Sequence, residues 1–152
     1  MNVEGAWSTA RAEQFLRERT IPVRLACHTP DGGLWMLSLW YRYGDGQLEC
    51  ATGATADVVR YLRADPAVAF EISTNKPPYR GVRGAGTVDI ASDEDKETLA
   101  ALVERYLGDT NQGLAERLLD PDREEVRLTV EIERAYTWDF SNRMQARKTD
   151  EE

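Results

Sequence analysis

The chain has 152 residues, the size of one domain, and its 41% hydrophobic and 30% charged content indicates an ordinary globular protein. Its 19 basic and 27 acidic residues give a formal net charge of -8. This balance argues against a nucleic-acid binder or a protein that adheres to anionic membranes, because both need a positive field. There is no signal pattern and no apolar run of about 18 residues. We expect a cytoplasmic single domain over residues 1–152, with a charged tail after about residue 146.

The predicted elements follow from hydrophobic periodicity and from turn residues. In chain order they are a helix over 8–19, strands over 21–27, 34–43 and 47–52, a helix over 55–64 capped by Thr55, strands over 67–73 and 79–90, helices over 92–107 and 111–119, and a strand over 126–140. The first three strands lack the intervening helices that parallel crossovers require. Six strands in which hairpins predominate favour an antiparallel barrel with helices packed outside.

The last strand has the clearest alternation in the chain. Apolar residues at 126, 128, 130 and 132 alternate with polar ones, and the same parity continues to Tyr136, Trp138 and Phe140. This period of two is typical of a strand with one buried face.

Several kinds of catalytic or metal site are not supported by the sequence. His28 is the only histidine, no serine lies in a G-x-S-x-G turn, and no zinc-ligand spacing occurs. A structural role is favoured for His28, and two free apolar fillers are favoured over a disulfide for Cys27 and Cys50. The carboxylates of 93–95 lie where the start of a helix favours negative charge. We therefore expect no metal.

The glycine-bearing strand is the most informative stretch. Arg80 and Arg83 are three residues apart, so they face opposite sides of a strand unless a bulge intervenes. Glycine in a strand is tolerated where a ligand or another backbone approaches closely, and guanidinium groups suit phosphate. A bulged barrel corner with solvated arginines explains the same residues equally well.

Two other stretches are candidates for ligand contact. Residues 50–55 run from a strand through small residues to the start of a helix, where free N–H groups suit an anion, although a plain helix cap gives the same pattern. The aromatic side chains of the second and last strands either fill the core or form the wall of a planar cofactor site. They are Trp35, Trp40, Tyr41, Tyr43, Trp138 and Phe140.

Taken in order, these segments resemble the pyridoxamine 5'-phosphate oxidase-like proteins, the FMN-binding split-barrel family. The resemblance covers about residues 8 to 145, and it depends on the order and spacing of the segments rather than on one motif. The matching segments are Leu37-Ser38-Leu39-Trp40-Tyr41, residues 45–52, residues 58–70, residues 79–86 and Trp138-Asp139-Phe140.

The resemblance implies a mainly β (α+β) fold, a six-stranded antiparallel split barrel with flanking helices. It also implies a homodimer with FMN in two clefts between the subunits. The residues expected near the flavin ring are Leu37, Ser38, Leu39, Trp40, Ala51 and Thr52. Those expected near the phosphate are Thr55, Ala56, Asp57, Arg60, Arg80, Gly81 and Arg83, and Trp138 is expected to come from the neighbouring subunit.

The chain departs from the family pattern at the start of the second helix, where Ala56 and Asp57 stand in place of Arg or Lys. Arg60 or Arg80 can compensate for that carboxylate. With Arg143-Met144 and no histidine after His28, true pyridoxamine phosphate oxidase activity is not expected.

We predict an FMN-dependent oxidoreductase acting on a small molecule that the sequence does not specify. The flavin ring itself carries the electrons, so no side-chain acid or base is required. The alternatives are a deazaflavin-dependent reductase, or a non-catalytic split-barrel dimer that binds haem, another planar ligand or none.

Overall fold

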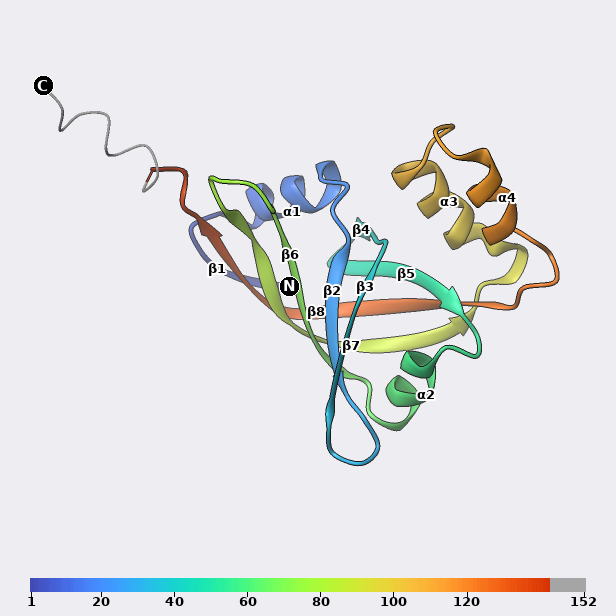
Figure 1. The fold of residues 1–152 in the computed structure, drawn as a ribbon. Coiled ribbons are helices and arrows are strands. Elements are labelled where there is room, and N and C mark those ends of the chain that lie inside the picture. The colour runs from blue at the N-terminus through green and yellow to red at the C-terminus, as the bar shows by residue number, and fades with distance from the viewer. Residues whose placement is uncertain (143–152) are drawn as a thin grey trace, which may run out of the picture.

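The computed structural model describes residues 1–142; the predicted tail after about residue 146, Arg143 and Met144 lie outside this range. Figure 1 shows a strongly bent sheet with helices around it. The strands are β1 (Asn2–Gly5), β2 (Val23–His28), β3 (Leu34–Leu39), β4 (Arg42–Gly44), β5 (Gln47–Gly53), β6 (Ala67–Ser73), β7 (Arg80–Ser92) and β8 (Glu125–Asp139). The helices are α1 (Thr9–Glu18), α2 (Asp57–Ala64), α3 (Glu97–Tyr106), which follows the 3-10 turn Glu94–Lys96, and α4 (Gln112–Leu118).

The strands form one sheet in the order β3-β2-β6-β7-β8-β5-β4, and β1 pairs with β8 in parallel. The other pairs are antiparallel. The predicted class, a mainly antiparallel split barrel with flanking helices, is confirmed. The prediction of six strands was too low, because the short β1 was not foreseen and the strand expected over 34–43 is divided into β3 and β4.

The strand expected over 34–43 is divided where its pairing partner changes, because β3 pairs with β2 and β4 pairs with β5. Tyr41 is fully buried, and its hydroxyl donates to the carbonyl of Leu16, 2.8 Å away, near the end of α1. Residues 40 and 41 belong to neither strand, and Tyr41 keeps the inward parity of Leu37, Leu39 and Tyr43. Apolar periodicity alone does not show where a strand changes its pairing partner.

A β-bulge changes which residues of β8 face the core. The β7–β8 register shifts between Ala85 and Gly86, leaving one extra residue on β8. Before the bulge the even-numbered residues are buried, whereas after it Ala135 and Thr137 are buried and Tyr136 is 45% exposed. The expectation that one parity continues to Tyr136, Trp138 and Phe140 was therefore wrong.

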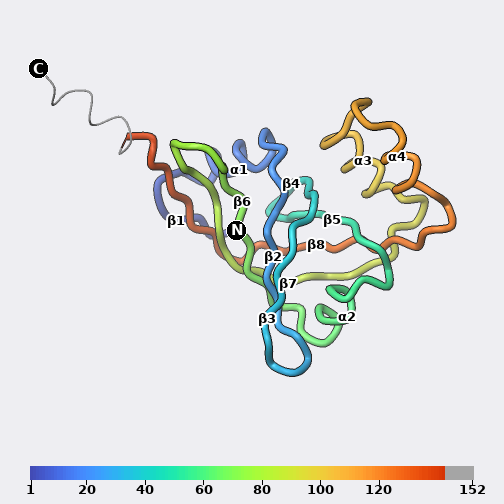
Figure 2. Tube along the Cα trace, viewed as in Figure 1, coloured from blue at the N-terminus to red at the C-terminus, as the bar shows by residue number. Residues whose placement is uncertain are grey.

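The helices lie on different parts of the sheet (Figures 1 and 2). The α3–α4 pair lies at the end where β7 finishes and β8 begins, whereas β1 pairs with the opposite end of β8. Ser8 caps α1 through a 3.2 Å bond from the Arg11 amide, as its position predicts. Thr55 does not cap α2, because the N-cap position is occupied by Ala56.

The remaining observations concern the cysteines, the histidine, metal-binding groups and membrane-spanning helices. Cys27 and Cys50 are free and buried, and burial raises the pKa of the Cys50 thiol to about 12. His28 is exposed at the end of β2. Among residues 1–142, no group of three or more His, Cys, Asp or Glu side chains is placed to hold a metal ion. No helix in the described range is both long and apolar enough to cross a bilayer.

Candidate functional site

A cavity of about 510 Å³ lies between the sheet and the α3–α4 pair; we call it the helix-side cavity. Five of the six residues predicted to contact a flavin ring line it: Ser38, Leu39, Trp40, Ala51 and Thr52. The sixth, Leu37, packs against the core. The opposite wall is formed by leucines of α3 and α4, and the Arg123–Glu125 ion pair, 3.2 Å from Nε to Oε1, also lines the cavity.

The ring of Trp40 is fixed by its neighbours. It stacks on Tyr106 with a centroid separation of 5.3 Å and an interplanar angle of 8°. The Tyr106 hydroxyl accepts from the Tyr41 amide and donates to the carbonyl of Ile21. Burial raises the pKa of both tyrosine hydroxyls, so both are protonated donors at neutral pH.

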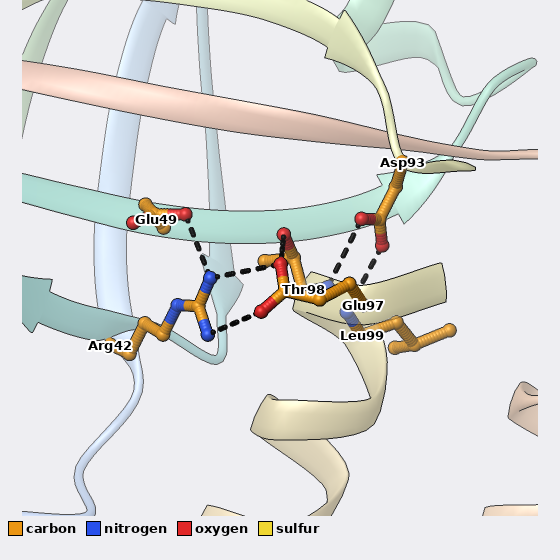
Figure 3. Close-up of polar contacts among 6 residues, drawn as sticks. All are labelled: Arg42, Glu49, Asp93, Glu97, Thr98 and Leu99. Atoms are coloured by element: carbon orange, nitrogen blue, oxygen red, sulfur yellow. Dashed lines mark hydrogen bonds and ion pairs between the residues drawn. The ribbon is translucent and has the colours of Figure 1, made fainter. Parts of the chain in front are cut away.

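Two anchors hold the first turn of α3 against the barrel, as Figure 3 shows. Asp93, only 6% exposed, accepts from the amides of Thr98 and Leu99 at 3.1 and 3.0 Å. Arg42 donates to Glu97 on α3 and to Glu49 on β5. The helix wall of the cavity is therefore fixed to the strands that carry the opposite wall.

The predicted phosphate contacts Thr55 and Ala56 lie between β5 and α2, and Asp57 is the first residue of α2. Asp57 is exposed and pairs with Arg60, 3.4 Å away and one turn along the helix. Both side chains of this ion pair are mostly exposed. Neither residue lines the helix-side cavity or the groove described next.

A second and larger concavity, of about 790 Å³, lies on the outward face of the sheet; we call it the outer groove. Its floor includes the small residues Ala26, Ala69 and Ala85 from β2, β6 and β7. Charged side chains around it are Arg24, Glu71, Arg83, Arg134 and Glu4, and the apolar rim includes Met36 and Tyr136.

Arg80 and Arg83 do lie on opposite faces of β7. Arg83 points outward and packs over the rings of Tyr136 and Trp138, at 5.0 and 5.2 Å from their centroids. Arg80 lies on the other face, and its Nε is buried without a partner among the described residues. The bulge lies beyond both arginines, so it does not bring them to one side.

Asp139 lies opposite Arg80 in the ladder, and the positive charge of Arg80 acts on its carboxylate. Burial alone would raise the pKa of this carboxyl, but hydrogen bonds from Ser141 and Trp7 and the Arg80 charge outweigh burial and lower it. Asp139 is therefore ionised at neutral pH.

Close backbone contacts account for the glycines of β7. A Cβ at Gly84 would collide with the Arg134 carbonyl, and one at Gly86 would collide with the Glu131 carbonyl, on either side of the bulge. These glycines mark a bulged corner, as one of the two sequence interpretations held. They are not themselves an indication of a ligand.

Within one chain the predicted site residues fall into three groups: the ring-lining set, the group at the start of α2, and the group where β7 begins and β8 ends. Thr52 pairs with Val126 near the start of β8, whereas Arg80 and Gly81 pair with Asp139 and Trp138 at its end. At about 3.3 Å per residue, roughly 40 Å of strand separates these two positions. The structure brings together the ring-lining set, but it does not bring Arg80, Gly81, Arg83 or Trp138 to it.

Sequence reasoning missed the helix wall of the cavity. Helices were predicted over 92–107 and 111–119, but none of their cavity-lining leucines, Leu99, Leu102, Leu114 and Leu118, was predicted as a site residue. The four-residue spacing of Leu114 and Leu118 places both on one face of α4, but nothing local indicates that this face meets a cavity rather than the core. Glu125 was not predicted to line a site either, because a carboxylate at the start of a strand normally faces solvent.

Solved structures with this fold were found by comparison. A conserved hypothetical protein from Mycobacterium tuberculosis has a TM-score of 0.70 and 26% identity, over 88% of this chain and 86% of its own. An F420 reductase has a TM-score of 0.67 and 26% identity, over 80% and 94%. A Listeria innocua protein assigned as a pyridoxamine 5'-phosphate oxidase has a TM-score of 0.64 and 14% identity, over 87% and 97%. No protein-family model and no curated protein matches this chain.

These comparisons confirm the resemblance that the sequence predicts. The chain has the split-barrel fold of the pyridoxamine 5'-phosphate oxidase-like proteins. Other proteins with this fold include a FAD-binding protein from Mesorhizobium loti, at 18% identity and a TM-score of 0.61, and a heme binding protein from Mycobacterium smegmatis, at 19% and 0.59.

Proposed function

We propose that this protein is a homodimeric oxidoreductase that binds FMN or a deazaflavin between its two subunits. The observation that carries the proposal is that five predicted ring-lining residues share one cavity, while the predicted arginine set lies at the other end of β8. A complete site of this composition needs residues from a second copy. When bound, such a cofactor supplies two-electron redox chemistry.

Exposed apolar residues support pairing with a second copy. The sheet ends at β3, where Leu34, Trp35 and Met36 are 77, 41 and 67% exposed, and Tyr136 is exposed beside the outer groove. An unpaired apolar edge of this kind is an association surface. The small residues on the floor of the outer groove allow another copy to approach the sheet closely.

The polar groups available suit an anionic ligand. The unpartnered Nε of Arg80 and the exposed guanidinium of Arg83 are donors of the type that binds phosphate. Asp57 at the start of α2 opposes an anion there, and its pairing with Arg60 reduces this effect. In our proposal Thr52, Ser38 and Trp40 contact the ring, and Arg80 of the other subunit contacts the phosphate.

The proposal is tested by the visible spectrum of the purified protein, by titration with FMN and with coenzyme F420, and by the mass in solution. We expect a dimer that takes up one cofactor per subunit. Arg80→Ala should weaken cofactor binding about tenfold or more, since it removes a charged donor, whereas the control Arg63→Ala, on the exposed face of α2, should not. A monomer, or a protein that takes up neither cofactor, would contradict the proposal.

Asp57 favours a second candidate, a dimer that binds a planar ligand without a phosphate, such as haem. One protein with this fold is a heme binding protein, and a ligand without a phosphate has no need of a basic group at the start of α2. A Soret band after addition of haemin, together with failure to bind FMN and F420, would favour this candidate over the first.

A further inference from the structure

We propose that the helix-side cavity binds a small, uncharged and largely apolar ring compound against the leucines of α3 and α4. Binding itself can be tested without any cofactor. The role of this compound as the substrate rests on the proposed function above.

The leucines of α3 and α4 border the helix-side cavity without filling it. Leu99 and Leu102 are buried in α3, but Leu114 and Leu118 of α4 are only half-buried, and α4 has no fully buried residue. Apolar side chains that face a cavity lose packing contacts that a ligand would restore. A cavity of about 510 Å³ is within the range of small-molecule sites.

The polar groups of the cavity exclude a charged ligand. The Glu125 side chain is 2% exposed, and Arg123 neutralises it at 3.2 Å. The other lining side chains with polar atoms, Ser38, Thr52 and the indole N–H of Trp40, are uncharged. A cation or an anion would lose its hydration against the leucines and would meet no unpaired counter-charge. An uncharged molecule with one hydrogen-bonding end fits this lining.

The wall is preformed where it meets the barrel. Asp93 and Arg42 fix the first turn of α3, and Arg105 fixes its last turn through bonds to three carbonyls of α1 and the residues after it. Lys96 donates to the Arg123 carbonyl, which fixes the segment that follows α4. A ligand therefore does not have to order α3 when it binds, which favours affinity.

The leucine wall is separate from the set assigned to the flavin ring. Ser38, Trp40 and Thr52 come from the sheet side, whereas the leucines come from helices that were not predicted to contact a cofactor. A molecule on the leucines would thus lie between the helices and the strands that carry the predicted ring contacts. That is the position expected for a compound that exchanges electrons with a bound ring.

The test uses the fluorescent ring compound N-phenyl-1-naphthylamine, which is uncharged, and its sulfonated counterpart 8-anilinonaphthalene-1-sulfonate. Leu118→Trp fills the cavity from α4, and Leu119→Trp is the matched control, because Leu119 lines a different depression beside Asp93. Leu114→Phe is a second filling variant, and thermal unfolding of each variant reports whether it is folded.

We expect the uncharged probe to bind saturably, with affinity reduced roughly tenfold or more by Leu118→Trp and unchanged by Leu119→Trp. Binding of the sulfonate should be unaffected by either change. No saturable binding of the uncharged probe, or an equal loss of sulfonate binding in Leu118→Trp, would overturn the proposal.

If FMN or F420 displaces the probe and Leu118→Trp also weakens that cofactor, the cavity belongs to the cofactor ring; this outcome overturns the inference but supports the proposed function. If neither cofactor binds and the probe still behaves as expected, the proposed function fails while the binding site stands.

Discussion

Arg105 on α3 links two helices that are far apart in the sequence. Its guanidinium donates to the carbonyls of Leu16, Arg17 and Arg19, where α1 ends and its last carbonyls have no helical partner. The same group lies over the rings of Tyr41 and Tyr106. One side chain thus satisfies the end of α1 and positions the tyrosines that hold Trp40.

We predict that Arg105→Ala lowers the free energy of unfolding by about 2 kcal/mol, because charge-assisted hydrogen bonds to partly buried carbonyls are lost. Urea unfolding followed by circular dichroism measures this. Arg117→Ala, on the exposed surface of α4, should change it by less than about 0.5 kcal/mol. Equal effects of the two substitutions would show that the contacts of Arg105 contribute nothing specific.

Asp139 gives the stability a dependence on acid pH. Its pKa in the folded chain is lowered, so its ionised form stabilises the fold above the pKa of the unfolded chain, about 3.9, and this contribution disappears as pH falls through the folded pKa. Asp139→Asn should therefore be less stable than the wild type at neutral pH. The difference should shrink towards zero near pH 2, measured by urea unfolding at each pH. A difference that does not vary with pH would contradict this assignment.

At the element scale, sequence reasoning succeeded where one local rule decided the structure. Residues 67–73 form β6 as predicted, because alternation is bounded by Pro66 and by the proline pair at 77–78. Sequence reasoning failed where pairing between segments far apart in the chain decided the structure. The division at 40–41 follows from a change of pairing partner, from β2 to β5, and the bulge in β8 depends on its register with β7.

The start of α3 is a second case of this kind. The sequence predicts that a helix starts at residue 92 and that the carboxylates of 93–95 suit this start, but the chain passes through left-handed conformations at Asp95 and Lys96 before the helix begins at Glu97. Asp93 therefore reaches the amides of Thr98 and Leu99 from five and six residues earlier. The cap residue lies in the predicted stretch, but its geometry depends on this turn.

Asp93→Ala should lower the free energy of unfolding by about 1 to 2 kcal/mol, because two amides at the start of α3 lose their acceptor. Asp93→Asn keeps one acceptor oxygen and should have a smaller effect. Both can be measured by chemical denaturation, with the exposed Glu94→Ala as control. If Asp93→Ala and Glu94→Ala behave alike, the cap does not hold the helix wall.

At the scale of the whole molecule, the candidate site could be predicted only in part. The order of segments identifies Ser38, Trp40 and Thr52, and these residues do share a cavity. The cavity itself could not be predicted, because α3 and α4 meet the sheet through contacts between residues far apart in the chain. The division of the predicted residues between the two ends of β8 likewise depends on the strand order, which local pattern does not specify.

The length of β8 has a consequence for mixtures of two defective variants. In the proposed dimer, each site takes Thr52 from one chain and Arg80 from the other. Thr52→Trp and Arg80→Ala should each bind little cofactor alone. After they are unfolded together and refolded, half of the dimers should be hybrids, each with one undamaged site, so that about a quarter of all sites recover full affinity. Equilibrium titration of the mixture would measure this rescue, and no rescue would mean that each chain builds its site alone.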